Sequence, residues 1–119
     1  MAIPSRVLAS GNAGLSTISI CGDGATGLVA VGTTAADALQ LSAVWNTLTT
    51  SSASTGVKLQ PTEAGAVVGL RNDSGQTILV YPATGSTINA GAASFSVATA
   101  KTALFFATSA TTWAAILTA

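Results

Sequence analysis

Short runs of β-branched and aromatic residues, separated by turn-forming residues, dominate the second half of the chain. The runs AVVGLRN (66–72) and QTILVYP (76–82) stand on either side of the turn cluster NDSG (72–75). Two such runs around an Asn, Asp and Gly turn are typical of a β-hairpin. The runs TALFFA (102–107) and TWAAIL (112–117) repeat the pattern across TSAT (108–111), which predicts a second hairpin.

The middle of the chain allows two interpretations. Alternate apolar residues over 39–43 are typical of a strand, whereas one set of apolar residues would also share a helix face: Leu41, Val44, Trp45 and Leu48. Thr and Ser are frequent over 47–55, and they are poor residues for a helix interior. We therefore expect a strand here, followed by further short strands at VKLQP (57–61) and SFSV (94–97).

The first 32 residues have a different character, because glycine interrupts every short apolar run. Such spacing favours an extended arm with at most one or two short strands. The fold class predicted for the whole chain is all-β: a small antiparallel β-sandwich or barrel over residues 33–119, with a Gly-rich extended N-terminal arm over residues 1–32. A chain of 119 residues can bury about two-thirds of its unfolded surface in one domain.

The later strands are apolar on both faces. In the run 77–81, Ile78 and Val80 share one face, and Leu79 and Tyr81 lie on the other. A strand of this kind is covered on both sides, either by another subunit or by the domain's own arm and loops. We favour another subunit. The candidate residues for an oligomer or capsid interface are Leu79, Tyr81, Phe105, Trp113 and Ile116.

The charge content supports association. Only 7% of the residues are charged, against about a quarter in ordinary soluble domains, and the formal net charge is zero. Hydrophobic residues make up 49% of the chain. A neutral and apolar surface promotes association between copies, so we expect a homo-oligomer.

The composition leaves little for catalysis. Without His, the chain can form neither a Ser–His–Asp arrangement nor a His-containing zinc site, and its single Cys cannot supply a Cys-only site. The nearest two acidic residues, Glu63 and Asp73, stand at opposite ends of a predicted strand. The four Lys and Arg residues are scattered, which disfavours nucleic acid as a partner. We expect no enzyme activity, no cofactor and no metal.

Three local motifs have ordinary explanations. The segment GDGATG (22–27) matches G-x-G-x-x-G, but the β-branched run LVAVGTT follows instead of a helix, which disfavours phosphate binding. Asn72, Asp73 and Ser74 form a glycosylation sequon that turn chemistry already explains. A sugar-stacking platform of Trp45, Tyr81 and Trp113 is possible in principle, but core or interface packing is the favoured use of these rings.

Targeting signals are weak. The apolar stretch after Arg6 is broken by glycines, and bulky Ile20 precedes Cys21 where a small residue should stand before a cleavage point. No run of about twenty apolar residues occurs. We expect a soluble, unprocessed chain with no membrane partner.

A series of short motifs runs through the C-terminal half in a fixed order: AGAVV (64–68), LVYP (79–82), ATGSTIN (83–89), FSV (95–97) and a closing T-x-W (111–113). The order resembles that of small tailed-phage virion proteins of the capsid decoration, or cement, family. The upstream segments IPSRVLASG (3–11) and ICGDGATGLVAVGTTAADALQL (20–41) are similar to the amino-terminal arm of such proteins.

The resemblance implies a β-rich structural protein of a bacteriophage virion, usually a trimer on the outer capsid surface. Its partner would then be the major capsid protein, and it would be made in the host cytoplasm. The alternative is a tail-fibre or adhesin module that binds a receptor or a glycan. A fibre tip should show a repetitive shaft sequence and exposed aromatic or charged loop clusters, and the sequence contains neither.

Overall fold

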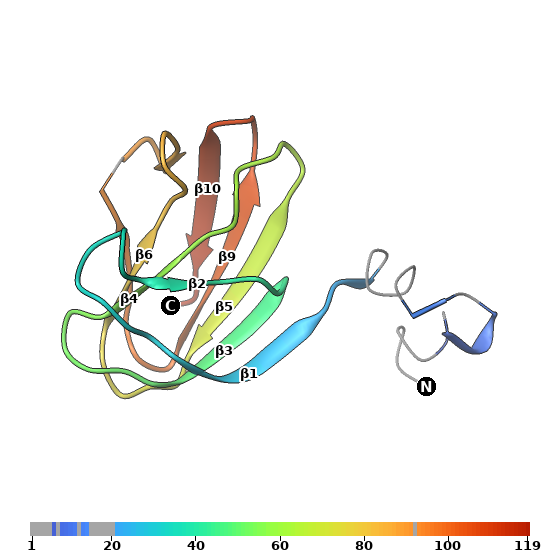
Figure 1. Ribbon diagram of the computed structural model, residues 1–119, viewed down its shortest axis with the longest axis horizontal. Coiled ribbons are helices and arrows are strands. Elements are labelled where there is room, and N and C mark those ends of the chain that lie inside the picture. Colours follow the sequence, from blue (N-terminus) through green and yellow to red (C-terminus); the bar gives the residue numbers. More distant parts are fainter. Residues whose placement is uncertain (1–5, 7, 12, 15–20, 92) are drawn as a thin grey trace.

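The computed structural model describes residue 6 and the ranges 8–11, 13–14, 21–91 and 93–119, and within them it forms ten strands (Figure 1). In chain order the strands are β1 (Gly24–Val29), β2 (Leu39–Gln40), β3 (Trp45–Thr50), β4 (Gly56–Lys58), β5 (Val67–Asn72), β6 (Ile78–Tyr81), β7 (Thr87–Ile88), β8 (Phe95–Val97), β9 (Lys101–Ala107) and β10 (Thr112–Leu117). The prediction of a mostly β protein is confirmed. The strand expected within residues 37–55 is also confirmed, as β2 and β3.

Two sheets face each other across the core. The larger has six strands in the order β1-β3-β5-β9-β10-β7, and the smaller has four in the order β2-β4-β6-β8. Phe95 of the smaller sheet meets Phe105 of the larger sheet edge to face, with ring centroids 5.6 Å apart. This two-layer arrangement agrees with the predicted sandwich.

The sheets are mixed, so the prediction of an antiparallel sandwich was wrong in this respect. From β1 to β6 the chain alternates between the two sheets, and β1, β3 and β5 pair in parallel in one sheet while β2, β4 and β6 do so in the other. Each connection crosses from one layer to the other, and therefore the next strand in a given sheet runs in the same direction as the previous one. The first six strands therefore form three successive turns of a two-layered coil, and each turn contributes one strand to each sheet.

The prediction of a hairpin across residues 72–75 was also wrong, because the two strands on either side of this turn do not pair with each other. β5 lies in the larger sheet and pairs with β3 and β9, whereas β6 lies in the smaller sheet and pairs with β4 and β8. Asn72 stands at the corner with 0% of its surface exposed. Its Nδ2 donates to the carbonyl oxygens of Gln76 (2.7 Å) and Val97 (2.9 Å), and its Oδ1 accepts from the backbone N–H of Ser74. These bonds hold a turn that passes from one sheet to the other.

The second predicted hairpin is confirmed. β9 and β10 pair antiparallel, with Trp113 opposite Ala107 and Leu117 opposite Ala103. The backbone N–H of Thr108 donates to the carbonyl of Thr112 and closes the turn. The last two strands therefore extend the larger sheet as a continuous hairpin, in contrast to the coils before them.

The predicted arm contains part of the larger sheet. β1 falls within residues 1–32, pairs in parallel with β3 and forms one edge of the sheet. One or two short strands were expected in this stretch, and β1 is one of them. Most of the sequence before residue 21 lies outside the described residues, so the separability of the arm from the sandwich over 33–119 stays a prediction.

Candidate functional site

One row of residues crosses five strands of the larger sheet on the side away from the core. Strand register places Gly24 opposite Trp45, Trp45 opposite Gly69, Gly69 opposite Leu104, and Leu104 opposite Ile116. The side chains of Trp45, Leu104 and Ile116 are 46%, 36% and 58% exposed. We call these five residues the outer row.

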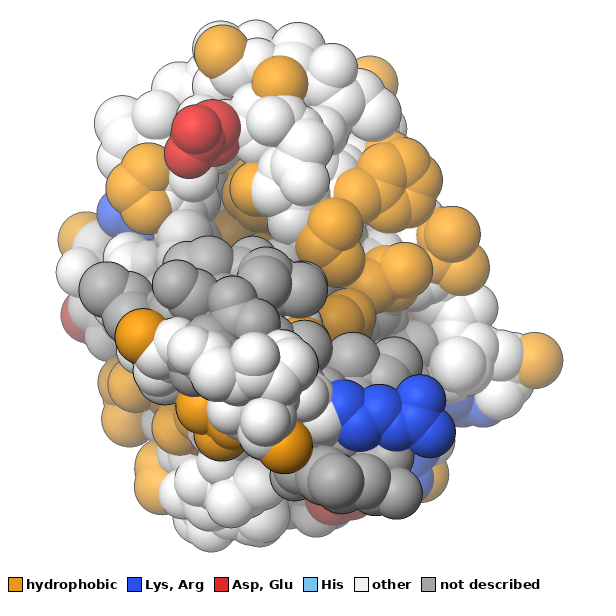
Figure 2. Space-filling model, turned by 90° about the vertical axis from the view of Figure 1, so that its right-hand side faces the viewer, with side chains coloured by type: hydrophobic (Ala, Val, Ile, Leu, Met, Phe, Trp, Pro, Cys, Tyr) orange, Lys and Arg blue, Asp and Glu red, His pale blue; other side chains and the backbone are white. Residues whose placement is uncertain are grey.

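A second apolar row lies beside the first. Val67 of β5 is exposed, and opposite it stands Phe106 of β9, which in turn stands opposite Ala114 of β10. Leu70 and Ala103, which alternate with these positions along β5 and β9, are buried in the core. Hydrophobic side chains gather on the right of the view in Figure 2. The two rows together form the outer face of the larger sheet.

Trp45 shapes the centre of this face. A Cβ atom built on Gly69 would lie 2.5 Å from Cε3 of the Trp45 ring, a distance shorter than van der Waals contact allows. The indole therefore lies directly over the Gly69 backbone, and its Nε1 donates to the carbonyl of Cys21 at 3.4 Å. Any side chain at position 69 would therefore have to displace the ring, which favours glycine there.

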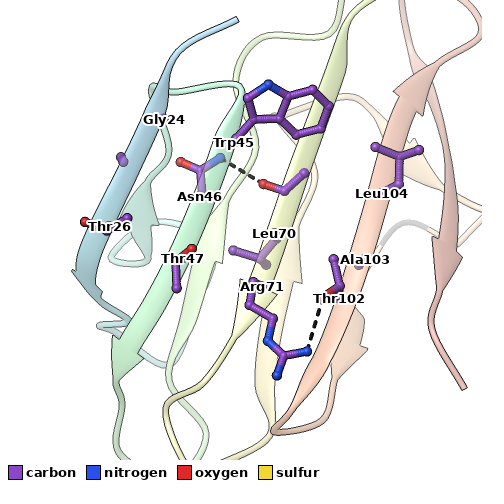
Figure 3. Close-up of a pocket in the computed structure, with 12 residues that line it drawn as sticks. Gly24, Thr26, Trp45, Asn46, Thr47, Leu70, Arg71, Thr102, Ala103 and Leu104 are labelled. Atoms are coloured by element: carbon purple, nitrogen blue, oxygen red, sulfur yellow. Dashed lines mark hydrogen bonds between the residues drawn. The ribbon is translucent and has the colours of Figure 1, made fainter. Parts of the chain in front are cut away.

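A shallow hollow of about 290 Å³ opens next to the ring. Its lining includes Trp45, Gly69 and Leu104 of the outer row, together with Thr47 and Arg71. Figure 3 shows the Trp45 ring at the upper end, Leu104 on β9 at the side and Arg71 at the lower end. The hollow is thus apolar over most of its walls and polar at one end.

The polar end is electrically neutral. Arg71 is the charged residue among those that line the hollow, and its Nε donates to Oδ1 of Asp73 at 2.7 Å. Its Nη1 also donates to the carbonyl of Ala100 at 2.9 Å. Both charged side chains are exposed, so the pair adds little to stability. It does fix the guanidinium in place and cancel its charge locally.

The five interface residues expected from the sequence do not lie together. Phe105, Trp113 and Tyr81 are 0%, 2% and 8% exposed, so the expectation of an interface is corrected for these three: they belong to the subunit's own core. Leu79 is half-buried in the smaller sheet. Of the five, Ile116 lies on the outer face.

Two of the buried rings have polar partners inside the subunit. Trp113 Nε1 donates to Oγ1 of Thr62 at 2.9 Å, and the hydroxyl of Tyr81 donates to the carbonyl of Thr33 at 3.2 Å. A buried indole N–H or phenol O–H normally finds such a partner. These contacts explain why large amphipathic rings are used here in the core. With Tyr81 and Trp113 buried, they cannot form a sugar-stacking platform with Trp45.

Sequence reasoning did not identify Val67 and Leu104 as surface residues, and for Trp45 it favoured core or interface packing without placing the ring on a particular face. The pattern could not orient these strands, because both of their faces are apolar. Gly69, which stands between Val68 and Leu70, could have indicated the exposed face. A glycine inside a strand often marks a site where another group approaches the backbone closely.

The other ionisable side chains of the described residues are not among those that line the hollow. Among the residues that the structure describes, no group of three His, Cys, Asp or Glu side chains could hold a metal ion. A hydrogen bond from the Thr34 hydroxyl, with further help from the Thr34 backbone N–H, lowers the pKa of Asp37 below its usual value. This carboxylate closes a loop before β2 and does not face the hollow.

The described part of the chain includes no helix with the length and apolar character needed to cross a membrane. Comparison of the chain with protein-family models, with curated proteins and with solved structures found no match.

Proposed function

We propose that this chain is a structural virion protein of the capsid decoration type, which binds the outer surface of a phage head as a homo-oligomer and stabilises the shell without catalysing a reaction. The observation that carries the proposal is the outer face of the larger sheet. Its exposed Trp45, Val67, Leu104 and Ile116 form an apolar surface that the described part of the subunit leaves uncovered. Such a surface is typical of a protein that functions in contact with other protein surfaces.

The stabilising effect follows from mass action. A protein that binds the assembled shell, and does not bind its separated subunits, shifts the equilibrium toward the shell. Apolar burial contributes about 25 cal/mol per Å² of surface removed from water. Because the chain carries only eight charged residues, its contacts should be mainly apolar and hydrogen-bonded and should depend weakly on salt.

The second candidate is a receptor-binding or glycan-binding module of a tail fibre or adhesin. The observation that favours it is the exposed indole of Trp45 beside the hollow, since ligand pockets combine apolar walls with a few polar groups. The partner would then be a small ligand or a host surface, and the protein would not affect the stability of the head.

The test is to assemble phage heads with and without the protein and to follow genome release during heating, at low and at high salt. The proposal expects a higher release temperature with the protein present, with a small change between the two salt concentrations. A cryo-EM reconstruction of the same particles should show its density on the outside of the head. Equal release temperatures, or density on the tail alone, would contradict the decoration role and favour the fibre candidate.

A further inference from the structure

The outer face carries both projecting side chains and a recess to receive one. Leu104 and Ile116 project from the outer row, and the hollow of about 290 Å³ lies beside Leu104 and the Trp45 ring, which lies over Gly69. A face of this kind is complementary to itself, because a projecting side chain on one copy can fill the hollow on another. The shape of the face does not by itself identify the molecule that binds there. The area and the charge of the face favour one candidate.

We propose that a second copy of this chain covers the outer face, with an apolar side chain of each copy seated in the hollow beside Trp45 of the other. This inference deepens the oligomer of the proposed function and rests on it, but it does not depend on binding to a phage head. It assigns the subunit interface to β1, β3, β5, β9 and β10. The isologous pair differs from the trimer that the family resemblance implies.

The extent of the face suits such a contact. Five strands at about 4.8 Å spacing span about 24 Å, and six residues along a strand run about 20 Å, which gives about 480 Å² for one face. Two copies would together bury about 1,000 Å², the lower limit for a specific interface. The contact would therefore lie at the low end of the range for specific interfaces, where association between two copies is weak or transient.

The charges of the face permit two identical surfaces to meet. Most charged side chains would repel their own copies across an isologous contact. Arg71 is the charged residue in the lining of the hollow, and Asp73 neutralises it at 2.7 Å. A face without net charge gains no electrostatic attraction from a charged partner. A second copy of this chain, whose formal net charge is zero, can contact it without repulsion.

The polar groups around the hollow favour a protein side chain over a sugar. Arg71 is already bonded to Asp73 and to the Ala100 carbonyl, and Thr102 Oγ1 accepts from its Nη1 at 3.4 Å. The Nδ2 of Asn46 donates to the carbonyls of Ala43 and Gly69. Arg71 Nε and Nη1 and the Asn46 Nδ2 are thus already bonded within the subunit, which leaves fewer donors for a sugar, although Asn46 Oδ1 is buried without a partner among the described residues.

The experiment measures oligomer mass and dissociation constant by native mass spectrometry and sedimentation equilibrium on the full chain. Leu104→Lys places a charge on each copy at the centre of the proposed contact, and we expect it to raise the dissociation constant by at least about 10-fold. The matched control is Ser96→Lys, which adds the same charge at an exposed position in β8 of the smaller sheet. We expect it to dissociate as the wild type does.

Far-UV circular dichroism of each variant verifies folding. If Leu104→Lys does not fold, Ile116→Lys, at a more exposed position of the outer row than Leu104, replaces it and is interpreted in the same way. A monomeric wild type would overturn the inference, and so would a folded variant that keeps the wild-type dissociation constant. Added oligosaccharide that competes with self-association would also overturn it, in favour of a glycan site. An intact oligomer that leaves the release temperature of heads unchanged would contradict only the decoration role.

Discussion

The indole of Trp45 on β3 lies over the backbone of Gly69 on the neighbouring parallel strand β5, so close that a Cβ atom at position 69 would lie 2.5 Å from the ring. The pairing of an aromatic residue with a glycine across two strands covers the backbone that the glycine leaves bare. Both residues line the hollow on the outer face. The geometry of the candidate interface therefore depends on a residue without a side chain.

We expect Gly69→Ala to displace the Trp45 ring, because the added methyl group occupies its position. The ring is partly exposed and can move outward, so the free energy of unfolding should fall by only about 1 kcal/mol. Tryptophan fluorescence should shift to longer wavelength as the ring enters water. Gly24→Ala is the control, since the nearest atom to its Cβ is 4.0 Å away. The same spectrum for both variants would contradict the contact.

Thr62→Val should destabilise the protein by about 1–3 kcal/mol, since it leaves the buried indole N–H of Trp113 without an acceptor. Thr62→Ser keeps the hydroxyl and should remain close to wild type. Urea denaturation of the two variants measures the difference. If valine and serine at position 62 have the same effect, the hydrogen bond is not what stabilises this part of the core.

Gly75→Val should lower the melting temperature. The backbone φ of Gly75 is +86°, and nothing lies within 4 Å of its Cβ position, so the cost arises from backbone strain of about 1–2 kcal/mol. An unchanged melting temperature would argue against the turn. Although the predicted hairpin is absent, the glycine is still required, because the turn that joins the two sheets uses the same left-handed conformation.

Ala100 offers the opposite test. Its φ is +63°, in the left-handed region that alanine disfavours, immediately before β9. Ala100→Gly removes the strain and should raise the free energy of unfolding by about 1 kcal/mol, less the entropy cost of glycine in the unfolded chain. Ala98→Gly, two positions earlier, relieves no such strain and should not stabilise. Thermal unfolding of the two variants measures the difference in stability. Equal effects of the two substitutions would contradict backbone strain at Ala100.

The Asp37 carboxylate should make stability depend on pH in acid. Its pKa in the folded protein lies below the ordinary value for an aspartate, so the ionised form stabilises the fold above about pH 4. That contribution is lost as the pH falls through the lowered pKa. We expect the melting temperature of the wild type to fall more steeply below pH 4 than that of Asp37→Ala. Parallel curves for the two proteins would show that the Thr34 contacts do not contribute.

The amino-acid sequence alone was sufficient to predict several local features of the fold. Alternation and β-branched residues predicted the strands, and the polar cluster at 108–111 predicted the β9–β10 hairpin because adjacent strands can pair directly across it. Gly75 marked a reversal of the chain. These features depend on a few neighbouring residues, and local physics is sufficient to specify them.

The pairing of the strands depends on the packing of the whole domain. A turn at 72–75 reverses the chain equally well within one sheet or between two, and the choice followed from the burial of Val68 and Leu70 of β5 against the opposite layer. The sequence carries a faint sign of the coils: Leu39, Val57 and Val80 stand in register on neighbouring strands of the smaller sheet, about 20 residues apart along the chain. This spacing can be recognised as a structural repeat only once the parallel pairing of the strands is known.

The packing of the whole domain also determines which face of each strand is exposed. Phe105 and Phe106 are adjacent, equally apolar residues, yet Phe105 is fully buried in the core and Phe106 lies on the outer face. A shift of one residue in register exchanges the two faces of a strand. A strand that is apolar on both faces therefore does not specify which face points toward the core. The packing of two whole sheets selects one arrangement, and it placed Trp113 in the core and left Ile116 at the surface.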